Sequence, residues 1–416
     1  MTFLQRLCLA LLSFNYLFSI EAQASTPSET KVESQTHWTS TWYAPIDTAG
    51  QTLAPTNIRQ WVRLSIGGEQ IRLHFSNLHG QTPLVLSSVY IARSKGSDKH
   101  DSEQQKEVFF SGIGTAIIPP GEEVTSDAIE LKTNALEELA ISFYLPTGAS
   151  PSSVHNTAMQ NALLLPGKNI SKTSNWYDGK KDDTRYFLNE VEVLGAEKAR
   201  AIVAFGDSLT DGVGIENDRY HRWTDFLAQR LQQNPQTRDV AVLNAGIAGN
   251  RLMRDAKAPF IGIAGLKRFD AEVLQRPGVS AVIVSIGTND ISANGAFKES
   301  SEFVSPEELI EGYRALIKAA HAKGIKIYGA TIKPRGGAKG ILPHTPEAEA
   351  MRLQINQWIR ESAEFDAVID FDLILRDPEQ THRLLSRYDS GDHTHPNASG
   401  YSVMAQGIDL RLFRAH

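Results

Sequence analysis

A serine stands at the abrupt end of a hydrophobic run near the middle of the chain, in the sequence FGDSL at residues 205–209. The run predicts a buried strand, and Gly206 gives the backbone freedom for a sharp exit, so we expect Ser208 at the carboxyl end of that strand. Open α/β sheets place their chemistry at this edge. A serine hydroxyl needs a base and an orienting acid to become a strong nucleophile. Asp392 and His395 supply both residue types, so the pattern is typical of nucleophilic catalysis.

Two more expected strand ends carry groups that could stabilise negative charge. The sequence NAGIAGN at residues 244–250 is rich in glycine, and Gly249 lets backbone N–H groups approach a ligand closely. The amide of Asn289 could donate a hydrogen bond to charge that develops on a carbonyl oxygen. Asp207 and Asp290 flank such positions, and we interpret them as braces that hold the loops through hydrogen bonds.

The elements that must position these residues alternate between strands and helices after residue 196. This alternation predicts a doubly wound, parallel five-stranded sheet covered by helices on both faces. We expect strands at residues 201–205, 240–244, 281–286, 326–332 and 367–371. Helices are expected at residues 223–233, 265–274, 306–323, 346–364 and 397–412.

The chain before this region alternates with period two and is interrupted by turn residues. Strands are expected at residues 60–66, 70–76, 84–93, 107–111, 124–131, 139–145 and 186–194. Gly67 and Gly68, between the first two runs, predict a β-hairpin. Short strands without a convincing helix between them predict an antiparallel sandwich.

The composition limits the class of protein. The chain has 416 residues, of which 41% are hydrophobic and 22% charged, and its formal net charge is −6. Its length favours two domains. Mild acidity without a basic run argues against nucleic acid as a partner.

Residues 1–24 have the features of a signal peptide. Arg6 gives a positive start, residues 7–20 form a largely apolar stretch, and small residues before Ala24 complete a cleavage site. We therefore expect export to the periplasm or out of the cell, with cleavage near Ala24. The single cysteine, Cys8, lies in the removed segment, so the mature chain has neither a disulfide nor a cysteine nucleophile. No later segment is long and apolar enough for a membrane span.

The segments that carry chemistry resemble the four blocks of the SGNH (GDSL-type) hydrolase family, in the family's order. The matching blocks are Gly206-Asp207-Ser208-Leu209, Gly249, Asn289 within Gly-Thr-Asn-Asp, and Asp392-x-x-His395. The segments at residues 38–42, 63–80, 360–372 and 388–401 are similar to a secreted subgroup with an amino-terminal β domain. The resemblance implies a signal peptide at 1–24, a jelly-roll-like β-sandwich domain at 30–195 and an SGNH catalytic domain at 198–416.

The resemblance also implies the roles of the site residues. Ser208 would be the nucleophile, His395 its base and Asp392 the acid that orients the imidazole. The backbone N–H groups of Ser208 and Gly249 and the side chain of Asn289 would form the oxyanion hole. The implied activity is that of a secreted serine esterase, without cofactor or metal, on acyl or acetyl esters of small molecules, lipids or carbohydrates.

Other patterns admit other chemistry. His393 and His395 could suggest a metal pair, but no third ligand clusters with them, and alternation in an extended segment would turn their rings apart. Asp370 and Asp372 fall on one face of the last expected strand, as a carboxylate-pair glycosidase would require, but nothing else supports that reaction.

A second class of function is a polysaccharide-binding protein whose hydrolase half is idle. Its sugars could stack on tryptophan, although the alternation around these residues favours core positions for Trp38, Trp42 and Trp61. The other histidines are expected to be solvated or satisfied in the core: His155, His321 and His344.

Overall fold

The computed structural model describes residues 37–95, 104–176, 178–195, 197–255, 257–258, 261–296, 300–339 and 342–414. Thr36–His416 forms one compact unit. The expected signal peptide and its cleavage site lie outside the described residues. Within the described ranges, no helix combines the length and the apolar character needed to cross a bilayer.

The first part of the chain, here called the β region, is built from strands. Their bounds are β1 (Trp38–Tyr43), β2 (Thr48–Ala49), β3 (Thr56–Arg63), β4 (Gln70–Ser76), β5 (Leu84–Arg93), β6 (Lys106–Glu107), β7 (Thr115–Ile118), β8 (Glu123–Thr125), β9 (Glu138–Leu145), β10 (Ser153–Asn156), β11 (Ala162–Pro166), β12 (Lys180–Asp182), β13 (Thr184–Tyr186) and β14 (Leu188–Leu194). One sheet has the order β1-β14-β4-β8, and a second has the order β12-β11-β3-β9-β5-β6 with β7 beside β5. The short strands β13-β10-β2 form a third sheet.

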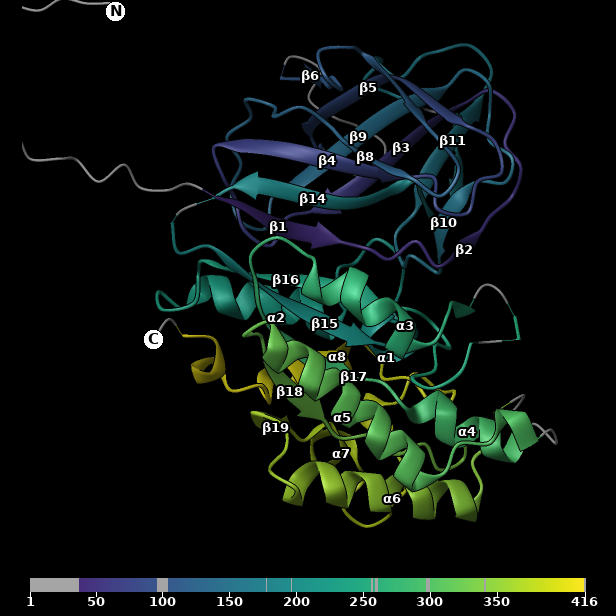
Figure 1. Cartoon of the computed structure of the whole chain (residues 1–416), viewed down its shortest axis with the longest axis vertical. Helices are drawn as coiled ribbons and strands as arrows, with labels where there is room; N and C mark the ends of the chain where they lie inside the picture. Colours follow the sequence, from purple (N-terminus) through teal and green to yellow (C-terminus); the bar gives the residue numbers. More distant parts are fainter. Residues whose placement is uncertain are drawn as a thin grey trace, which may run out of the picture. The chain divides into compact units, whose positions relative to one another are not determined.

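The two larger sheets pack face to face around a hydrophobic core (Figure 1). The ring of Phe75 on β4 lies 5.5 Å from that of Phe143 on β9, in an edge-to-face arrangement. Neighbouring strands of both sheets are antiparallel. The expected antiparallel sandwich is confirmed.

The hairpin expected around Gly67 and Gly68 is wrong. β3 pairs with β9 and β11, whereas β4 pairs with β14 and β8, so the chain crosses from one sheet to the other between them. Neither glycine has the positive φ that a type I′ turn requires. A Cβ on Gly67 would lie 2.2 Å from the carbonyl oxygen of Thr133, so the glycine permits two backbones to approach each other.

The rest of the chain, here called the α/β region, contains a parallel sheet with the strands β15 (Arg200–Gly206), β16 (Val240–Gly246), β17 (Val279–Ser285), β18 (Lys326–Ala330) and β19 (Ala367–Ile369). The helices are α1 (Ser208–Asp211), α2 (Trp223–Gln233), α3 (Gly265–Phe269), α4 (Thr288–Ala296), α5 (Pro306–Ala322), α6 (Pro346–Glu361), α7 (Phe371–Leu375) and α8 (Ala398–Gln406). A π-helical turn at Asp270–Leu274 continues α3, and 3₁₀ turns lie at Ser300–Glu302, Ser386–Tyr388 and Leu410–Phe413.

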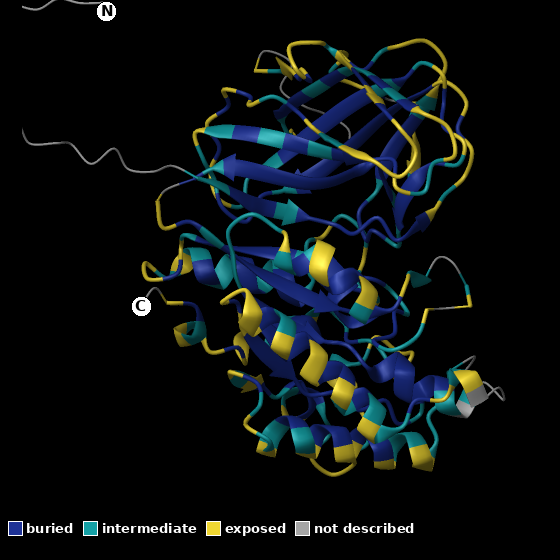
Figure 2. Cartoon of the chain, viewed as in Figure 1, coloured by how far each residue is buried: buried dark blue, intermediate teal, exposed yellow. Residues whose placement is uncertain are grey.

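Alternate side chains of β15 enter the cores on the two faces of this sheet. Ile202 and Ala204 belong to the cluster that contains residues of α2, α7 and α8. Val203 and Phe205 belong to the cluster that contains residues of α3, α5 and α6. The strands are buried and the outer faces of the helices are exposed (Figure 2). The predicted doubly wound sheet is therefore confirmed.

The strand order β16-β15-β17-β18-β19 fixes where a site can form. The chain passes from β15 to one neighbour, β16, and then returns to the other side of β15 to form β17. Ligands of open α/β sheets bind outside the carboxyl ends of the strands at such a reversal. Ser208, Gly249 and Asn289 each follow one of these three adjacent strands.

The last strand is shorter than expected. The strand predicted at residues 367–371 ends at Ile369, because the side chain of Asp370 caps α7 by accepting the N–H of Leu373 at 3.0 Å. Asp370 and Asp372 are therefore not alternate residues of one strand.

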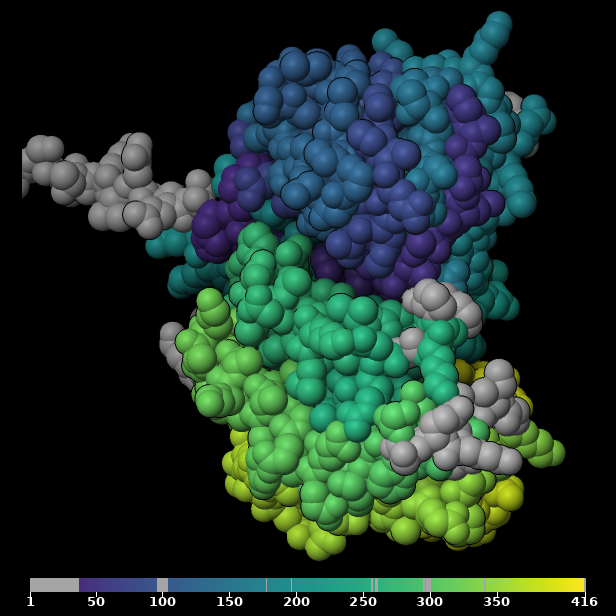
Figure 3. All heavy atoms as spheres, turned by 45° about the vertical axis from the view of Figure 1, so that its right-hand side comes forward, coloured from purple at the N-terminus to yellow at the C-terminus, as the bar shows by residue number. Residues whose placement is uncertain are grey.

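The β region packs against β16 of the α/β region. Ser65 Oγ accepts the N–H of Val242 and donates to its carbonyl, each at 3.0 Å. Val193 of β14 and Leu243 of β16 belong to one continuous buried cluster. Figure 3 shows the atoms of the two regions in contact along this junction.

Candidate active site

Ser208 begins α1, and only Asp207 separates it from the end of β15, which lies between β16 and β17 in the sheet. Oδ1 of Asp207 accepts the N–H of Leu209 at 3.0 Å and caps this helix. A Cβ on Gly206 would lie 2.1 Å from Oγ1 of Thr210, so only glycine fits the tight exit from β15. Ser208 keeps 9% of its surface exposed. The hydroxyl group is thus held at the surface end of a buried strand.

His395 connects Ser208 to a carboxylate. Nε2 of His395 lies 2.8 Å from Oγ of Ser208, and Nδ1 lies 2.6 Å from Oδ2 of Asp392. Oδ1 of Asp392 accepts the backbone N–H groups of Thr394 at 2.8 Å and His395 at 2.7 Å. The structure therefore brings together the three residues that the sequence analysis proposed as nucleophile, base and acid.

The charge states of this pair follow from its surroundings. Burial raises the pKa of Asp392, but hydrogen bonds from the side chain and backbone of His395 outweigh it and hold the pKa well below its usual range. Burial lowers the pKa of His395; Asp392 opposes this shift, whereas Lys333 and Arg335 reinforce it. A neutral imidazole beside an ionised carboxylate can accept a proton from the serine hydroxyl.

A second aspartate and histidine stand beside the first pair. Nδ1 of His393 lies 2.6 Å from Oδ2 of Asp389, so this ring has its own carboxylate. The two histidines are paired separately, as His393 with Asp389 and His395 with Asp392. This arrangement does not make His393 and His395 a pair of metal ligands.

Asn289 is linked to the loop of Gly249 through the next residue of that loop, Asn250. Nδ2 of Asn289 donates to the carbonyl oxygen of Asn250 at 2.9 Å, which leaves its second N–H for another acceptor. Gly249 has a φ of +79°, which favours glycine. Within the described part of the chain, the backbone N–H groups of Ser208 and Gly249 make no hydrogen bond. Donors of the kind needed by an oxyanion are thus present at three adjacent strand ends.

The two aspartates interpreted as braces do hold loops. Asp290 is fully buried, and its carboxylate accepts the N–H groups of Leu252 at 2.7 Å and Met253 at 2.9 Å. Asp207 caps the helix of Ser208, as described above. The interpretation of both residues as braces is confirmed.

Two further braces were missed by the sequence analysis. Arg268 donates to the carbonyl oxygens of Gly206 at 2.7 Å and Ala245 at 2.9 Å, and to Oδ1 of Asn250 at 3.0 Å. Asp211 accepts the N–H of Ala248 at 2.9 Å. Both bind the ends of β15 and β16 together, and neither lies in a recognisable motif.

His155 of the β region contacts this assembly. Its Nε2 lies 3.0 Å from Oδ1 of Asp211 and its Nδ1 lies 3.1 Å from Oδ2 of Asp47, and the residue is 4% exposed. Burial alone would lower the pKa of this imidazole, but Asp211 and Asp47 raise it to about 10. His155 is thus buried between two carboxylates, which agrees with the expectation of a histidine satisfied in the core.

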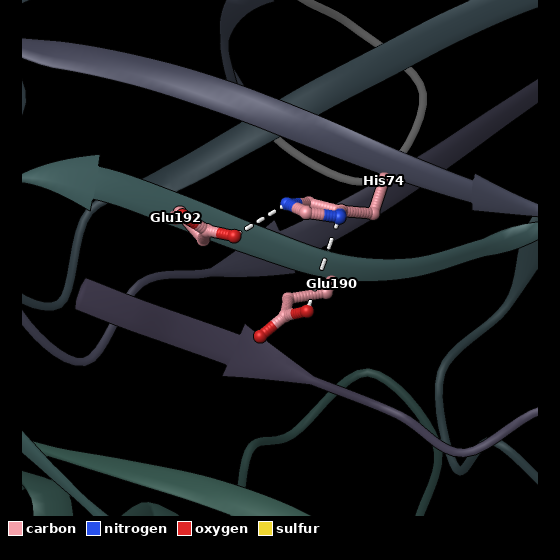
Figure 4. Close-up of side chains that lie close together, drawn as sticks. All are labelled: His74, Glu190 and Glu192. Atoms are coloured by element: carbon pink, nitrogen blue, oxygen red, sulfur yellow. Dashed lines mark ion pairs between the residues drawn. The ribbon is translucent and has the colours of Figure 1, made fainter. Parts of the chain in front are cut away.

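One group in the described ranges has metal-ligand residue types close together: His74, Glu190 and Glu192 in the β region (Figure 4). Nε2 of His74 lies 2.6 Å from Glu192. Arg72 also pairs with Glu192, at 2.5 Å, and Arg276 of the α/β region pairs with Glu190 at 2.6 Å. Cationic side chains already compensate both carboxylates, so this cluster is an ion-pair network.

Asp370 and Asp372 also serve ion pairs. Arg360 pairs with both, at 2.8 Å and 2.6 Å, and Arg352 pairs with Asp372 at 2.8 Å. Neither carboxylate is available as the acid or base of a glycosidase.

The tryptophans and the other histidines have ordinary contacts. Trp61 is 3% exposed and belongs to a hydrophobic cluster. The guanidinium of Arg72 lies 4.3 Å from the Trp38 ring, and that of Arg185 lies 4.9 Å from the Trp42 ring. His321 pairs with Asp366 at 2.9 Å and His344 lies 3.6 Å from Glu349.

The chain is similar to several solved structures over about half of its length. The aryl esterase of M. smegmatis is 17% identical and aligns over 52% of this chain and 100% of its own, with a TM-score of 0.40. A carbohydrate acetylesterase from Sinorhizobium meliloti is 16% identical over 51% of this chain and 98% of its own, with a TM-score of 0.40. A GDSL-like lipase from Bacteroides thetaiotaomicron is 18% identical over 51% of this chain and 86% of its own, with a TM-score of 0.37.

A search among curated proteins found no match. In the comparison with family models, residues 204–403 match the GDSL-like Lipase/Acylhydrolase family. The match begins within β15 and ends within α8, so it spans Ser208, Gly249, Asn289, Asp392 and His395. The segment of the α/β region that holds these five residues is therefore similar to the GDSL-like lipases and acylhydrolases.

Proposed function

We propose that the protein is an exported serine esterase that hydrolyses acyl or acetyl esters through an acyl-enzyme. The observation that carries the proposal is the continuous hydrogen-bonded series from Ser208 through His395 to Asp392. The match of residues 204–403 to an acylhydrolase family supports it independently.

The first half of the reaction forms the acyl-enzyme. Ser208 Oγ attacks the carbonyl carbon of the ester while Nε2 of His395 takes the hydroxyl proton. The N–H groups of Ser208 and Gly249 and the free N–H of Asn289 stabilise the oxyanion. When the tetrahedral intermediate collapses, His395 gives its proton to the departing alcohol, and the acyl group stays on Ser208.

The second half releases the acid. Water attacks the acyl carbonyl as His395 takes one of its protons, and that proton returns to Ser208 Oγ as the acid leaves. Asp392 keeps the imidazole in the tautomer with its proton on Nδ1 and stabilises the imidazolium in each half. No cofactor takes part in these steps.

A fluorophosphonate probe tests this proposal, because it reacts covalently with an activated serine. We expect the wild-type protein to be labelled and Ser208→Ala to remain unlabelled while keeping its thermal unfolding temperature. Ser402→Ala is the matched control, since the hydroxyl of Ser402 on α8 only accepts a side-chain hydrogen bond from Gln406 in the described structure. Well-folded wild-type protein without labelling would contradict the proposal and favour a polysaccharide-binding protein with an idle hydrolase half.

The substrate class is proposed more broadly: a small ester, a lipid or an acetylated carbohydrate. Rates on p-nitrophenyl acetate, butyrate and longer esters, beside acetylated xylan, separate these classes. Export is part of the same proposal, and so is a division into a signal peptide at 1–24, a β domain at 30–195 and a catalytic domain at 198–416. Amino-terminal sequencing of the secreted protein tests the cleavage site near Ala24.

A further inference from the structure

Lys333 is a buried lysine without a partner next to the active site. It follows β18 and is 2% exposed. Its Nζ makes no hydrogen bond within the described residues, and no carboxylate forms an ion pair with it there. A buried ammonium group without a partner is costly, so its placement calls for a compensating role.

The lysine shares a cavity with the serine. This cavity has a volume of about 20 Å³, and its lining includes Asp207, Ser208, Lys333 and Thr394 together with other polar and apolar residues. That space is sufficient for about one water molecule. Lys333 and Ser208 therefore line the same small cavity.

Charges of both signs act on this position. Asp207 and Asp392 are the carboxylates that favour a charged Lys333, whereas Arg335 and Arg352 disfavour it. Burial is the largest effect and lowers the pKa of Lys333 to about 7. The ammonium form of Lys333 therefore predominates in acidic solution below this value.

The same charges act on His395. Asp392 favours its imidazolium form, and burial, Lys333 and Arg335 disfavour it. Arg335 is itself held in place, because it donates to Ser292 Oγ and to the carbonyl oxygen of Leu342. Lys333 lacks such bonds. A substitution of Lys333 can therefore remove its effect on the pKa of His395 without breaking a hydrogen bond.

We propose that Lys333 is a positioning residue that keeps the imidazole of His395 neutral in acidic solution. This proposal rests on the proposed function in taking His395 as the general base. The enclosed positive charge repels a proton on His395, so the base stays competent at lower pH than the Asp392–His395 pair alone would allow. The charge of Lys333 also favours the carboxylate form of Asp207, which lines the same cavity.

The test compares the acidic limb of kcat/KM for p-nitrophenyl acetate in wild type and Lys333→Met. We expect the midpoint of this limb to rise by at least about 0.5 pH unit in Lys333→Met. At pH values well below both midpoints, this shift lowers kcat/KM about threefold relative to wild type. Lys333→Arg keeps the charge and should retain the wild-type midpoint. Lys326→Met is the control, because Lys326 lies at the other end of β18 and pairs with Asp366.

Titration of the His395 ring by NMR, with histidine labelled at Cε1 and the signal assigned with His395→Gln, gives a readout that needs no activity. The wild-type midpoint should lie below the ordinary value of about 6.5 and rise in Lys333→Met. Equal midpoints in both proteins would overturn the proposal. If Lys333→Met does not fold, the wild-type titration is sufficient by itself: a His395 midpoint at or above about 6.5 would overturn the proposal. If the His395 midpoint differs between wild type and Lys333→Met but the wild-type protein has no esterase activity, the proposed function is contradicted and the electrostatic effect of Lys333 is supported.

Discussion

Nε2 of His155 lies 3.0 Å from Oδ1 of Asp211, which joins β10 of the β region to the short helix that begins at Ser208. The other oxygen of Asp211 accepts the N–H of Ala248, the residue before Gly249. His155 of the β region therefore contacts the carboxylate of Asp211. That carboxylate in turn accepts a hydrogen bond from the loop that contains Gly249, a proposed oxyanion donor. The β region is in this way a structural part of the site.

Replacing His155 by Gln should destabilise the protein in a pH-dependent way. The substitution leaves Asp47 and Asp211 buried without their cation, and removal of one partner from a buried ion pair costs about 3–5 kcal/mol. Asp211 and Asp47 raise the folded-state pKa of His155 to about 10. The stabilisation is therefore complete below the unfolded-state pKa of about 6.5 and is lost as the pH rises through about 10.

Urea unfolding at several pH values checks this prediction. The difference between wild type and His155→Gln in the free energy of unfolding should be largest near about pH 6 and shrink toward about pH 10.5. His321→Gln is the control, since His321 forms an exposed pair with Asp366 and such pairs contribute about 0–1 kcal/mol. A difference that does not change with pH would show that His155 is not protonated in the folded protein.

Replacing Asn289 by Ala should lower kcat by about 10²–10³ with little change in KM, because an oxyanion donor acts mainly in the transition state. Asn289→Asp keeps the size of the side chain but cannot donate, so we expect a loss at least as large. Steady-state kinetics on p-nitrophenyl acetate measure both. A variant that raises KM and spares kcat would instead assign Asn289 to ground-state binding.

The positions of the site residues were open to prediction because topology determines them. The carboxyl ends of parallel strands meet at one edge, so the segments after β15, β16 and β17 had to converge once the strands were recognised. Helix α2 was predicted with its observed bounds, since its apolar side chains recur with helical spacing. Hydrophobic periodicity is a local property of the sequence, so it predicts such elements without information about distant contacts.

Contacts between distant parts of the chain cannot be recognised from local sequence patterns. Gly67 and Gly68 have the composition of a hairpin turn, but Thr133, brought in from another strand connection, decides their conformation. His155 and Asp211 belong to different regions, and no spacing relates them. Lys333 follows an ordinary strand, and only the assembled sheet shows that its ammonium group is enclosed beside Ser208.

Replacing Asp392 by Asn should lower kcat by about 10⁴-fold while the fold is kept. Oδ1 of the new amide can still accept the N–H groups of Thr394 and His395, so the turn before α8 survives. The amide nitrogen, however, donates to Nδ1 of His395, which places the imidazole proton on Nε2 and leaves no acceptor for the Ser208 proton. The neighbouring pair provides a matched control: Asp389 accepts the N–H groups of Gly391 and His393 and contacts Nδ1 of His393 at 2.6 Å. Asp389→Asn should therefore disturb a similar turn and leave kcat within a few-fold of wild type, and equal losses in the two variants would mean that Asp392 acts only by holding its loop.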